Sequence, residues 1–570
     1  MKRKIIERIA KSKTEEFYSP FPPGYKIGRT KYIVVAGSVM SGVGKGIFAS
    51  SLAKLISYFG FKIEPIKIDG YLNQDAGTLN PFRHGEVFVL DDGTECDMDL
   101  GSYERFLDKT LSKENYLTAG MIFKRVLEKE RKGEYLGRDV QFIPHVTGEI
   151  KLALRNLAVN TKADIILLEI GGTVGDYENA YIIEGVRQLI YEEGKKNVCF
   201  INVSYILEPQ NLGEQKSKPA QLGLNRLMGL GIQPDVVVCR SHNPVSKKIK
   251  EKISVYSNVP LRYVIGLHDI STVYEAPLLL KKERVDELVL EKLGLVKKAK
   301  RLKQRIQLRK WGRFVRRYLK AKKKVTIGIA GKYTGLRDSY ASILKAVEHA
   351  ATECNARAGV KFIETTSISS VKDAGRLLRD VDALIVPGGF GKRGSEGKIA
   401  CISYARLNKI PFLGLCFGFQ LAVVEFARNK CRLKDANSTE LDQETKHPVI
   451  CILPEQNLNQ LGGTMRLGKY PAKLLRGSLV WRLYKKRDVV YERHRHRYEV
   501  NPSYVDVLEK NGLVFSGKSL DGKLMEFLEL PLDEHPFFVA TQSHPEFKSR
   551  PMKPSPLFLG LVKAAIENRG

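Results

Sequence analysis

Two short stretches of the sequence contain residue types that can do chemistry. Lys45 lies in a glycine-rich turn, GSVMSGVGKG, that follows an apolar run, and Cys416 lies in the stretch LGLCFGFQ. In the first stretch, glycines let backbone N–H groups curl around phosphate oxygens, and the lysine and the following helix N-terminus add positive potential. A bare glycine-rich turn is more often structural. Gly-Lys directly after an apolar strand favours a nucleotide phosphate.

A metal ion at this loop would need ligands from elsewhere in the chain. The position after the lysine usually holds a Ser or Thr that ligates Mg²⁺, but here it is Gly46. Asp97 and Asp99 in one acidic stretch, and Glu169 near the C-terminal end of an apolar strand, offer carboxylates. A carboxylate pair plus phosphate oxygens suits the oxygen coordination of Mg²⁺. Helix capping and loop solvation are the alternative interpretation of these acids.

Cys416 has the sequence context of a nucleophile. A buried strand, Gly-x-Cys-x-Gly and a helix predict a sharp elbow that exposes the cysteine above a sheet, and a helix N-terminus stabilises a thiolate. His544 and Glu546 in QSHPEF offer a base and its orienting acceptor, and we expect an extended segment with both side chains on one face. The other seven cysteines show no CxxC pairing or zinc spacing, so we expect most to be small buried apolar residues.

The elements that must position these residues form two series of strands and helices. Runs such as YIVVAG and DIILLEIGG alternate with helical stretches over residues 31–295, and a second series spans residues 324–570. This pattern is typical of mostly parallel sheets covered by helices, and the length suits two domains. We therefore predict two doubly wound α/β domains, joined by a basic linker helix over residues 296–323 and preceded by a basic extension, residues 1–30.

The net charge of +31 is unevenly distributed. Residues 1–31 and 297–324 together account for 21 of these charges. A basic tract is more often a solvated helix face than a base-reading surface, so we expect no specific nucleic-acid partner, although the excess favours polyphosphate ligands. No apolar run reaches the length of a membrane span, and the N-terminus lacks a signal-peptide core. We expect a cytoplasmic protein without a membrane partner.

Longer stretches of the sequence resemble the CTP synthase family. They are GSVMSGVGKGI, HGEVFVLDDG, DLGSYERFLD, EIGGTVGD and GEQKSKPAQ, and the order Cys, then His-x-Glu, resembles class I glutamine amidotransferases. The resemblance covers about residues 31 to 565. It implies an N-terminal P-loop synthetase domain and a C-terminal class I glutamine amidotransferase domain. The implied activity is that of a ligase of pyrimidine nucleotide biosynthesis, which makes CTP from UTP, ATP and glutamine.

The resemblance also implies cofactors and partners. They are Mg²⁺ with ATP, no organic prosthetic group, GTP as an allosteric activator and CTP as a feedback inhibitor. Members of the family form homotetramers whose interfaces complete the nucleotide sites, and filaments are common. Ammonia released from glutamine would travel through a sheltered passage, because protonation in water would remove its nucleophilicity.

The resemblance assigns roles by position. The catalytic positions of the second half are Cys416, His544 and Glu546. Positions that match ATP contacts are Gly42, Val43, Gly44, Lys45, Gly46, Ile47, Lys67, Asp99, His268, Asp269 and Ile270, and Asp99 with Glu169 would carry the metal. Positions that match UTP and CTP contacts are Ser41, Asp176, Tyr177, Glu178, Lys216, Ser217, Lys218, Gln221 and Lys252. Positions that match glutamine contacts are Gly389, Phe417, Gly418, Phe419, Gln420, Glu440 and Arg497.

Within the glutamine set, Gly389 and the amide of Phe417 match the oxyanion position. We expect His494 and His496 to be structural or close to the ammonia passage. The chain departs from the family pattern at Ser38, Gly70 and Ala220, which we expect to affect pyrimidine-site detail and CTP feedback but not the chemistry.

Two other functions remain open at this stage. One is an ATP-dependent amidotransferase with a different acceptor, against which GEQKSKPAQ argues. The other is a non-catalytic protein that builds filaments or binds RNA through the basic segments.

Overall fold

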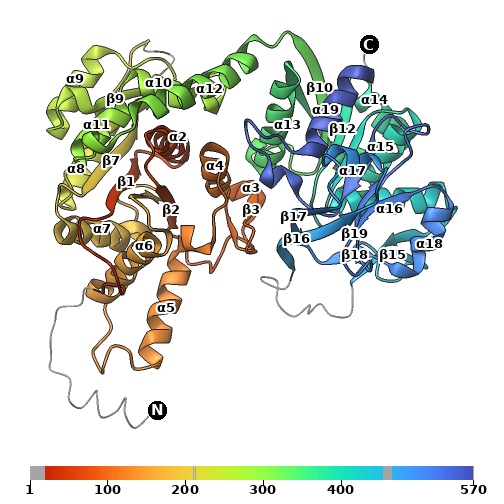
Figure 1. Ribbon diagram of the computed structural model, residues 1–570, viewed down its shortest axis with the longest axis horizontal. Helices are drawn as coiled ribbons and strands as arrows, with labels where there is room; N and C mark the ends of the chain where they lie inside the picture. Colours follow the sequence, from red (N-terminus) through yellow and green to blue (C-terminus); the bar gives the residue numbers. More distant parts are fainter. Residues whose placement is uncertain (1–19, 210, 212, 453–464, 569–570) are drawn as a thin grey trace. The chain divides into compact units, whose positions relative to one another are not determined.

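The computed structural model describes residues 20–209, 211, 213–452 and 465–568 of the 570-residue chain (Figure 1). These residues fall into two units: unit 1 comprises residues up to 75 together with 102–315, and unit 2 comprises residues 76–101 together with those from 316 onwards. Residues 1–19 of the predicted basic extension lie outside the described part. Within the described part, no helix has both the length and the hydropathy of a membrane span.

Unit 1 is built on a seven-stranded parallel sheet with the order β5-β2-β6-β1-β7-β8-β9. Val34 of β1 lies opposite Leu168 of β6 and Phe200 of β7, and all three are buried. The strands are near-continuous apolar runs because both faces of the sheet are covered. Their bounds are β1 Lys31–Ser38, β2 Ile63–Asp69, β5 Tyr116–Thr118, β6 Ile165–Ile170, β7 Val198–Tyr205, β8 Val236–Ser241 and β9 Val264–His268.

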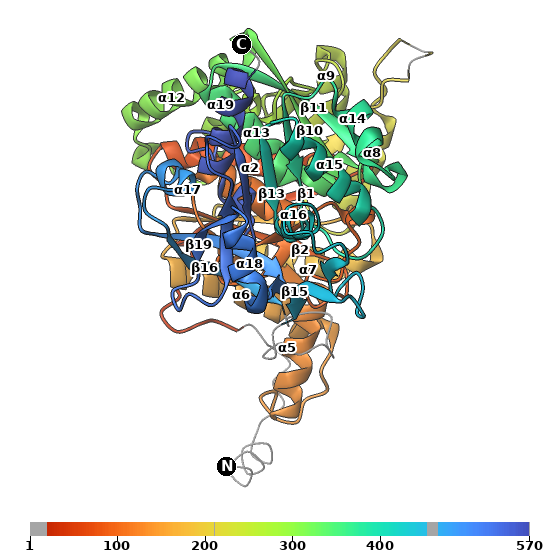
Figure 2. The same cartoon turned by 90° about the vertical axis from the view of Figure 1, so that its right-hand side faces the viewer.

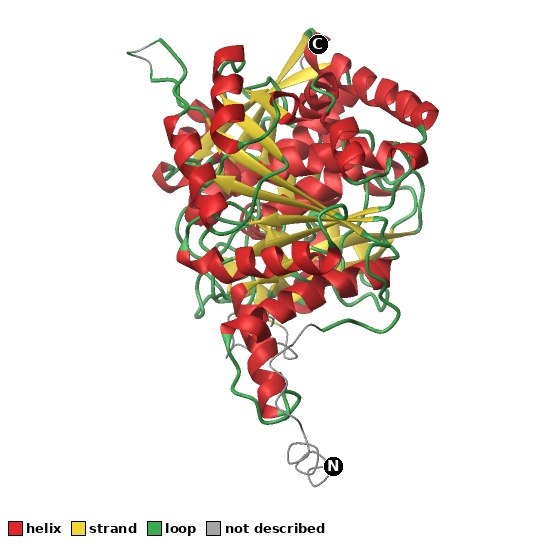
Figure 3. Cartoon of the chain, turned by 90° about the vertical axis from the view of Figure 1, so that its left-hand side faces the viewer, coloured by secondary structure: helices red, strands yellow, loops and turns green. Residues whose placement is uncertain are grey.

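Helices lie on both faces of this sheet (Figure 3). Tyr32, Val34 and Ala36 share one apolar cluster with α5, α6 and α7, whereas α2 packs with α10 and α11 outside that cluster. The helices are α2 Lys45–Tyr58, α5 Ala119–Arg131, α6 Thr147–Thr161, α7 Ala180–Glu193, α8 Lys218–Gly229, α9 Lys247–Ser257, α10 Ala276–Lys282, α11 Val285–Lys292 and α12 Arg301–Lys320, with α4 Met98–Leu107 crossing from unit 2. The doubly wound arrangement is thus as predicted.

The basic segment predicted as a helix forms α12. Its apolar residues Trp311 and Phe314 pack with Phe106 and Tyr274, and the Trp311 Nε1–H donates to the Tyr274 carbonyl at 2.8 Å. Leu302, 74% exposed, lies outside this contact. An aromatic cluster therefore fixes the middle of the helix to unit 1.

Unit 2 contains a nine-stranded sheet with the order β11-β10-β12-β13-β21-β20-β19-β16-β17. The first five strands are parallel and the remaining four pair in antiparallel fashion, an extension that sequence analysis did not anticipate. The strands are β10 Lys323–Gly331, β11 Ala356–Glu364, β12 Ala383–Val386, β13 Phe412–Leu415, β16 Arg466–Leu474, β17 Val489–His496, β19 Val514–Lys518, β20 Met525–Glu529 and β21 Phe538–Thr541. A smaller sheet holds β14 Ala436–Ser438, β15 His447–Ile452 and β18 Tyr498–Val500.

The parallel part of this sheet is also covered on both faces (Figures 1 and 2). Leu384 and Val386 belong to one apolar cluster with α14, α15 and α16, while the alternate residues Ile385 and Leu413 belong to another with α13 and α19. The helices are α13 Ala341–Glu353, α14 Val371–Leu378, α15 Ser395–Leu407, α16 Phe417–Asn429, α17 Leu479–Leu483, α18 Pro502–Lys510 and α19 Pro556–Asn568.

Residues 76–101 fold with unit 2, although they interrupt the sequence of unit 1. They form α3 Pro81–His84 and a hairpin of β3 Val87–Val89 and β4 Glu95–Asp97. Arg493 Nε lies 2.6 Å from Asp91 Oδ1, and Arg495 Nε lies 2.7 Å from Glu95 Oε1. The span 31–295 that the sequence predicts as one domain therefore contains a segment that folds as part of unit 2.

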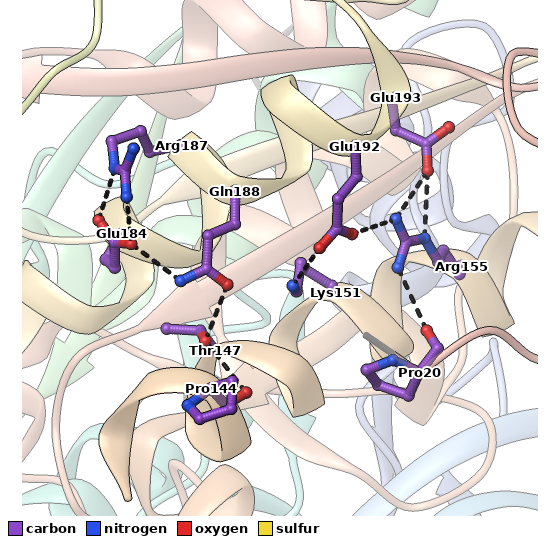
Figure 4. A network of polar contacts seen from close by, with 10 residues as sticks. All are labelled: Pro20, Pro144, Thr147, Lys151, Arg155, Glu184, Arg187, Gln188, Glu192 and Glu193. Carbon is purple, nitrogen blue, oxygen red and sulfur yellow. Dashed lines mark hydrogen bonds and ion pairs between the residues drawn. The ribbon is translucent and has the colours of Figure 1, made fainter. Parts of the chain in front are cut away.

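A buried ionic network ties α6 to α7 in unit 1 (Figure 4). Arg155 donates to Glu192 Oε2 at 2.6 Å and to Glu193 Oε1 at 2.9 Å, and the Arg155 and Glu193 side chains are fully buried. Arg155 also donates to the Pro20 carbonyl at 3.2 Å, and its guanidinium carbon lies 4.0 Å from the Phe21 ring centroid. This network therefore also anchors the chain that precedes β1.

We predict that Arg155→Met destabilises unit 1 by about 3 kcal/mol, because it leaves the Glu193 charge buried without its partner. That loss corresponds to a fall of roughly 6–10 °C in the melting temperature. Arg187→Met is the matched control: Arg187 pairs with Glu184 on the surface of α7, and we expect a loss below about 1 kcal/mol. Thermal unfolding of both variants measures the difference, and equal losses would contradict the role given to the buried network.

Candidate active site

Cys416 lies at a sharp turn between β13 and α16. Its backbone has φ 51° and ψ −104°, a strained conformation for a residue with a side chain. The flanking glycines allow the turn, because a Cβ on Gly418 would lie 2.0 Å from the Val386 carbonyl oxygen, and a Cβ on Gly414 would lie 2.8 Å from Ala540 Cβ. This is the geometry of a nucleophile elbow at the carboxyl edge of a parallel sheet.

His544 and Glu546 lie beside this elbow in contact with each other. His544 Nδ1 is 2.7 Å from Glu546 Oε1. A Cβ on Gly388 would lie 2.9 Å from His544 Cε1 and 3.6 Å from Cys416 Cβ, so the imidazole and the cysteine border the same glycine. Burial alone would lower the pKa of His544, but the negative charges of Glu546 and Cys416 outweigh it and raise the pKa to about 10. The surroundings of His544 therefore favour its protonated form.

The prediction that the segment with these two residues is extended is wrong, because the segment forms a turn. His544 precedes a 3₁₀ turn at Pro545–Lys548, so Glu546 reaches the imidazole from within the turn. Alternation along a strand is thus not the reason that they meet. The proline at the first position of the turn favours this bend. The predicted conformation is therefore wrong, but the two side chains are in contact as predicted.

The loop between β12 and α15 faces the elbow and carries Gly389. Glu440 Oε1 accepts a hydrogen bond from the Gly391 N–H at 2.6 Å, and burial raises the pKa of Glu440. Gln420, on α16, donates to the Tyr498 carbonyl at 2.9 Å. Phe417, Gly418 and Phe419 form the first turn of α16. Arg497 lies between β17 and β18, and its charge acts on Glu440.

The glycine-rich loop of unit 1 leads from β1 into α2, as predicted. Gly42 and Gly44 have φ of 69° and 92°, conformations that glycine adopts readily. Lys45, the first residue of α2, is buried and its Nζ donates to the Gly172 carbonyl. Val43, Gly46 and Ile47 complete the turn, while Ser41 at its tip is exposed. The loop thus presents backbone N–H groups and one ammonium at the carboxyl edge of the sheet.

Acidic and basic residues of neighbouring strands meet next to this loop. Lys67 on β2 is in register with Glu169 on β6, and Lys67 Nζ lies 3.7 Å from Asp69 Oδ1. The Tyr103 hydroxyl donates to Glu169 Oε2 at 2.6 Å. Asp69 fills the space beside Gly171, where a Cβ would lie 2.1 Å from its Oδ1. This edge of the sheet therefore contains cations for phosphate and carboxylate oxygens for a metal ion.

Asp99 belongs to the segment that folds with unit 2, whereas Glu169 belongs to unit 1. The Asp99 N–H donates to Asp97 Oδ1 at 2.8 Å at the start of α4. Among the described residues, no three His, Cys, Asp or Glu side chains cluster as a metal site. Each of these carboxylates is an oxygen donor of the type that Mg²⁺ prefers.

The positions matched to the pyrimidine nucleotide follow successive strands of unit 1. Asp176, Tyr177 and Glu178 come after β6, and Asp176 Oδ2 accepts a hydrogen bond from the Thr173 N–H at 2.7 Å. Lys216, Ser217, Lys218 and Gln221 span the end of the β7–α8 connection and the first turn of α8, and Lys252 lies on α9. The loops after β6 and β7 leave the carboxyl edge of the sheet, where open α/β folds bind ligands.

The positions matched to adenine lie at the end of β9. His268 ends the strand, and Asp269 accepts from Arg240 and pairs with His242 Nδ1 at 2.7 Å. Arg240 also lies beside the phosphate loop, because a Cβ on Gly44 would lie 3.6 Å from Arg240 Nε. His242 is one of the residues that line a cavity of about 860 Å³ between the β7 and β8 loops. Arg240 thus links the phosphate loop to the segment 268–270.

Two departures from the family pattern have local explanations. Ser38 is fully buried, and its hydroxyl contacts Ser204 Oγ at 2.9 Å and Asn202 Nδ2 at 3.0 Å, so the extra polar group is satisfied. Gly70 lies against Asn179, whose Oδ1 would be 2.6 Å from a Cβ there. Ala220 is fully buried on α8.

Sequence reasoning missed several residues of these sites. Asp69 ends an apolar strand as Glu169 does, so the same signal could have identified it. Tyr103 and Arg240 reach their partners only through tertiary contacts.

Two protein families match successive parts of the chain. Residues 31–295 match the family described as CTP synthase N-terminus, and residues 336–564 match the family described as class-I glutamine amidotransferase. The CTP synthase of Pyrococcus abyssi is 52% identical over 540 residues, which cover 94% of this chain and 98% of that protein. The CTP synthase of Methanocaldococcus jannaschii is 50% identical over 542 residues, which cover 94% and 98% of the two chains.

A solved structure, the glutaminase domain of Trypanosoma brucei CTPS with bound acivicin, is 36% identical and covers 43% of this chain and 94% of that chain, with a TM-score of 0.40. The relatives named CTP synthase match at half identity along nearly the whole sequence, and both halves match their families. The chain belongs to the CTP synthase family of ligases.

Proposed function

We propose that this chain forms CTP from UTP, ATP and glutamine, with glutamine hydrolysis in unit 2 and amination of UTP in unit 1. The observation that carries the proposal is the position of Cys416 at a nucleophile elbow, where Cys416 and the hydrogen-bonded pair His544–Glu546 border Gly388, in a chain whose other unit has a phosphate loop. Family membership supports the pairing of these two chemistries.

In the proposed glutaminase reaction, the Cys416 thiolate attacks the side-chain amide carbon of glutamine. The N–H groups of Gly389 and Phe417 stabilise the oxyanion, and His544 donates its proton to the departing ammonia. His544 then activates the water that hydrolyses the thioester to glutamate. Glu546 holds the imidazole and stabilises its protonated form. Glu440, Gln420 and Arg497 recognise the amino-acid end of glutamine.

In the proposed synthetase reaction, the γ-phosphate of ATP is transferred to O4 of UTP, and ammonia displaces the phosphate at C4. The products are CTP, ADP and inorganic phosphate. Lys45 and Lys67 neutralise phosphate charge, and the positions after β6 and β7 hold UTP or CTP. When bound, Mg²⁺ would help to neutralise the phosphate charge, and Asp99 and Glu169 are the residues that would hold it. Regulation by GTP and CTP, a homotetramer, and a cytoplasmic location follow from the family resemblance and belong to the same proposal.

We predict that Cys416→Ala abolishes CTP formation with glutamine but retains it with ammonium, because only the ammonia supply is lost. Lys45→Ala should abolish both activities, since both need the phosphates of ATP. The measurement is CTP production from UTP and ATP with either nitrogen donor. Cys354→Ala is the control for a cysteine outside the elbow and should retain both activities.

Three results would count against the proposal. Glutamine-dependent synthesis in Cys416→Ala would exclude the nucleophile, and synthesis in Lys45→Ala at saturating ATP would exclude the phosphate loop. If the wild-type protein hydrolyses glutamine but forms no CTP with either donor, the acceptor is a different compound.

We predict that Glu546→Gln moves the alkaline limb of the glutaminase pH profile to lower pH. The carboxylate is a cause of the raised pKa of His544, so removing its charge lets the imidazolium lose its proton at lower pH. Because the reaction needs the protonated imidazole as its acid, activity should then fall earlier as pH rises. The dependence of kcat/KM on pH tests this, and an unmoved alkaline limb would show that Glu546 does not set the His544 pKa.

A further inference from the structure

Lys398 is a buried cation that the reaction described above does not use. It lies on α15 with 2% of its surface exposed, and among the described residues it forms no ion pair with a carboxylate. Its Nζ donates to the Pro387 carbonyl at 3.1 Å. Burial, together with the charge of Lys332, lowers the pKa of Lys398 to about 7. A buried ammonium without a carboxylate costs stability, so its retention needs a reason.

Lys398 lies next to Gly389 and Phe417, the two residues whose N–H groups would form the oxyanion hole. Its Nζ lies 5.2 Å from the ring centroid of Phe417 and 3.5 Å from the position that a Cβ on Gly389 would take. The Cys416 charge acts on it in the favourable direction. One side chain thus contacts both the loop that carries the Gly389 N–H and the residue that carries the second N–H.

The loop is held at both of its ends. Lys398 binds the carbonyl of Pro387, and Lys332 donates to the carbonyl of Phe390. The N–H of the Phe390–Gly391 peptide is bound by Glu440. The peptide that carries the Gly389 N–H lies between these two fixed peptide planes. A Gly-Gly pair has no side chains that would fix its own conformation, so the external contacts must do so.

We propose that Lys398 is a positioning residue of the oxyanion hole: by holding the Pro387 carbonyl and lying over Phe417, it orients the Gly389 N–H towards the oxygen that becomes negative. The inference rests on the proposed glutaminase function of unit 2. Its specific consequence is that Lys398 contributes to the steps that form an oxyanion and not to the nucleophilicity of the thiolate.

Lys398→Met tests this, because methionine has a similar length and no hydrogen-bond donor. Lys392→Met is the matched control, since Lys392 is exposed in the loop before α15, six residues from Lys398. Loss of a single oxyanion donor in enzymes costs about 10²–10³ in kcat, so a misaligned donor should cost roughly 10–100-fold. We expect that fall in the glutaminase kcat of Lys398→Met, with KM changed less than about twofold, and no change in Lys392→Met.

A second reaction of the same cysteine separates positioning from a general structural effect. Alkylation of Cys416 by iodoacetamide displaces iodide and forms no oxyanion, so Lys398→Met should react at the wild-type rate. Ammonium-dependent CTP formation should also be unchanged, which shows that the variant is folded. If the variant does not accumulate as folded protein, Lys398→Gln replaces it under the same criteria.

Two outcomes overturn the inference. An unchanged kcat would show that Lys398 does not orient the hole, and alkylation slowed by the same factor as kcat would show that it acts on the thiolate or on the fold. Failure of the proposed function is distinguishable from both, because wild-type protein would then show no glutaminase activity that depends on Cys416.

Discussion

The glutaminase site depends on the close approach of α16 to the sheet at the Cys416 elbow. A residue with φ 51° and ψ −104° costs about 1–3 kcal/mol and persists only where the surroundings impose it. Two close contacts impose it: Gly418 packs on the Val386 carbonyl, and Gly414 packs on the Ala540 side chain across the paired strands β13 and β21. The strain at Cys416 is thus compensated by sheet pairing and burial throughout the parallel part of unit 2.

Strand β17 joins this elbow to residues far away in the sequence. The Arg493 carbonyl accepts the His544 N–H at 2.7 Å, and the Arg495 carbonyl accepts the Cys416 thiol at 3.5 Å. The side chains of both arginines pair with Asp91 and Glu95 of the hairpin 76–101. Arg493 is fully buried, so its charge depends on the Asp91 partner. Asp91 and Glu95, which follow the phosphate loop in the sequence, therefore support the backbone that positions Cys416 and His544.

The sequence predicted much of this arrangement where the signal was local. Apolar runs, glycine punctuation and a lysine after the turn were sufficient for the parallel sheets, the phosphate loop at Lys45 and the elbow at Cys416. The 3₁₀ turn after His544 was missed because a His-x-Glu spacing fits both a strand and a tight turn. The pairing of Arg493 with Asp91 joins residues about 400 positions apart, and periodicity contains no information about such contacts.

The environment, and not the residue type, sets the pKa of the histidines in this region. His494 and His496 lie on β17, with their rings 5.2 Å apart. Burial lowers the pKa of His494, and the charges of His496 and Arg466 lower it further. The nearby Glu526 does not compensate, because its own burial raises its pKa to about 7 and Arg466 is its partner. His544 is also buried but faces Glu546 and Cys416, which favour its protonated form. The neutral form is therefore favoured at His494 and the protonated form at His544.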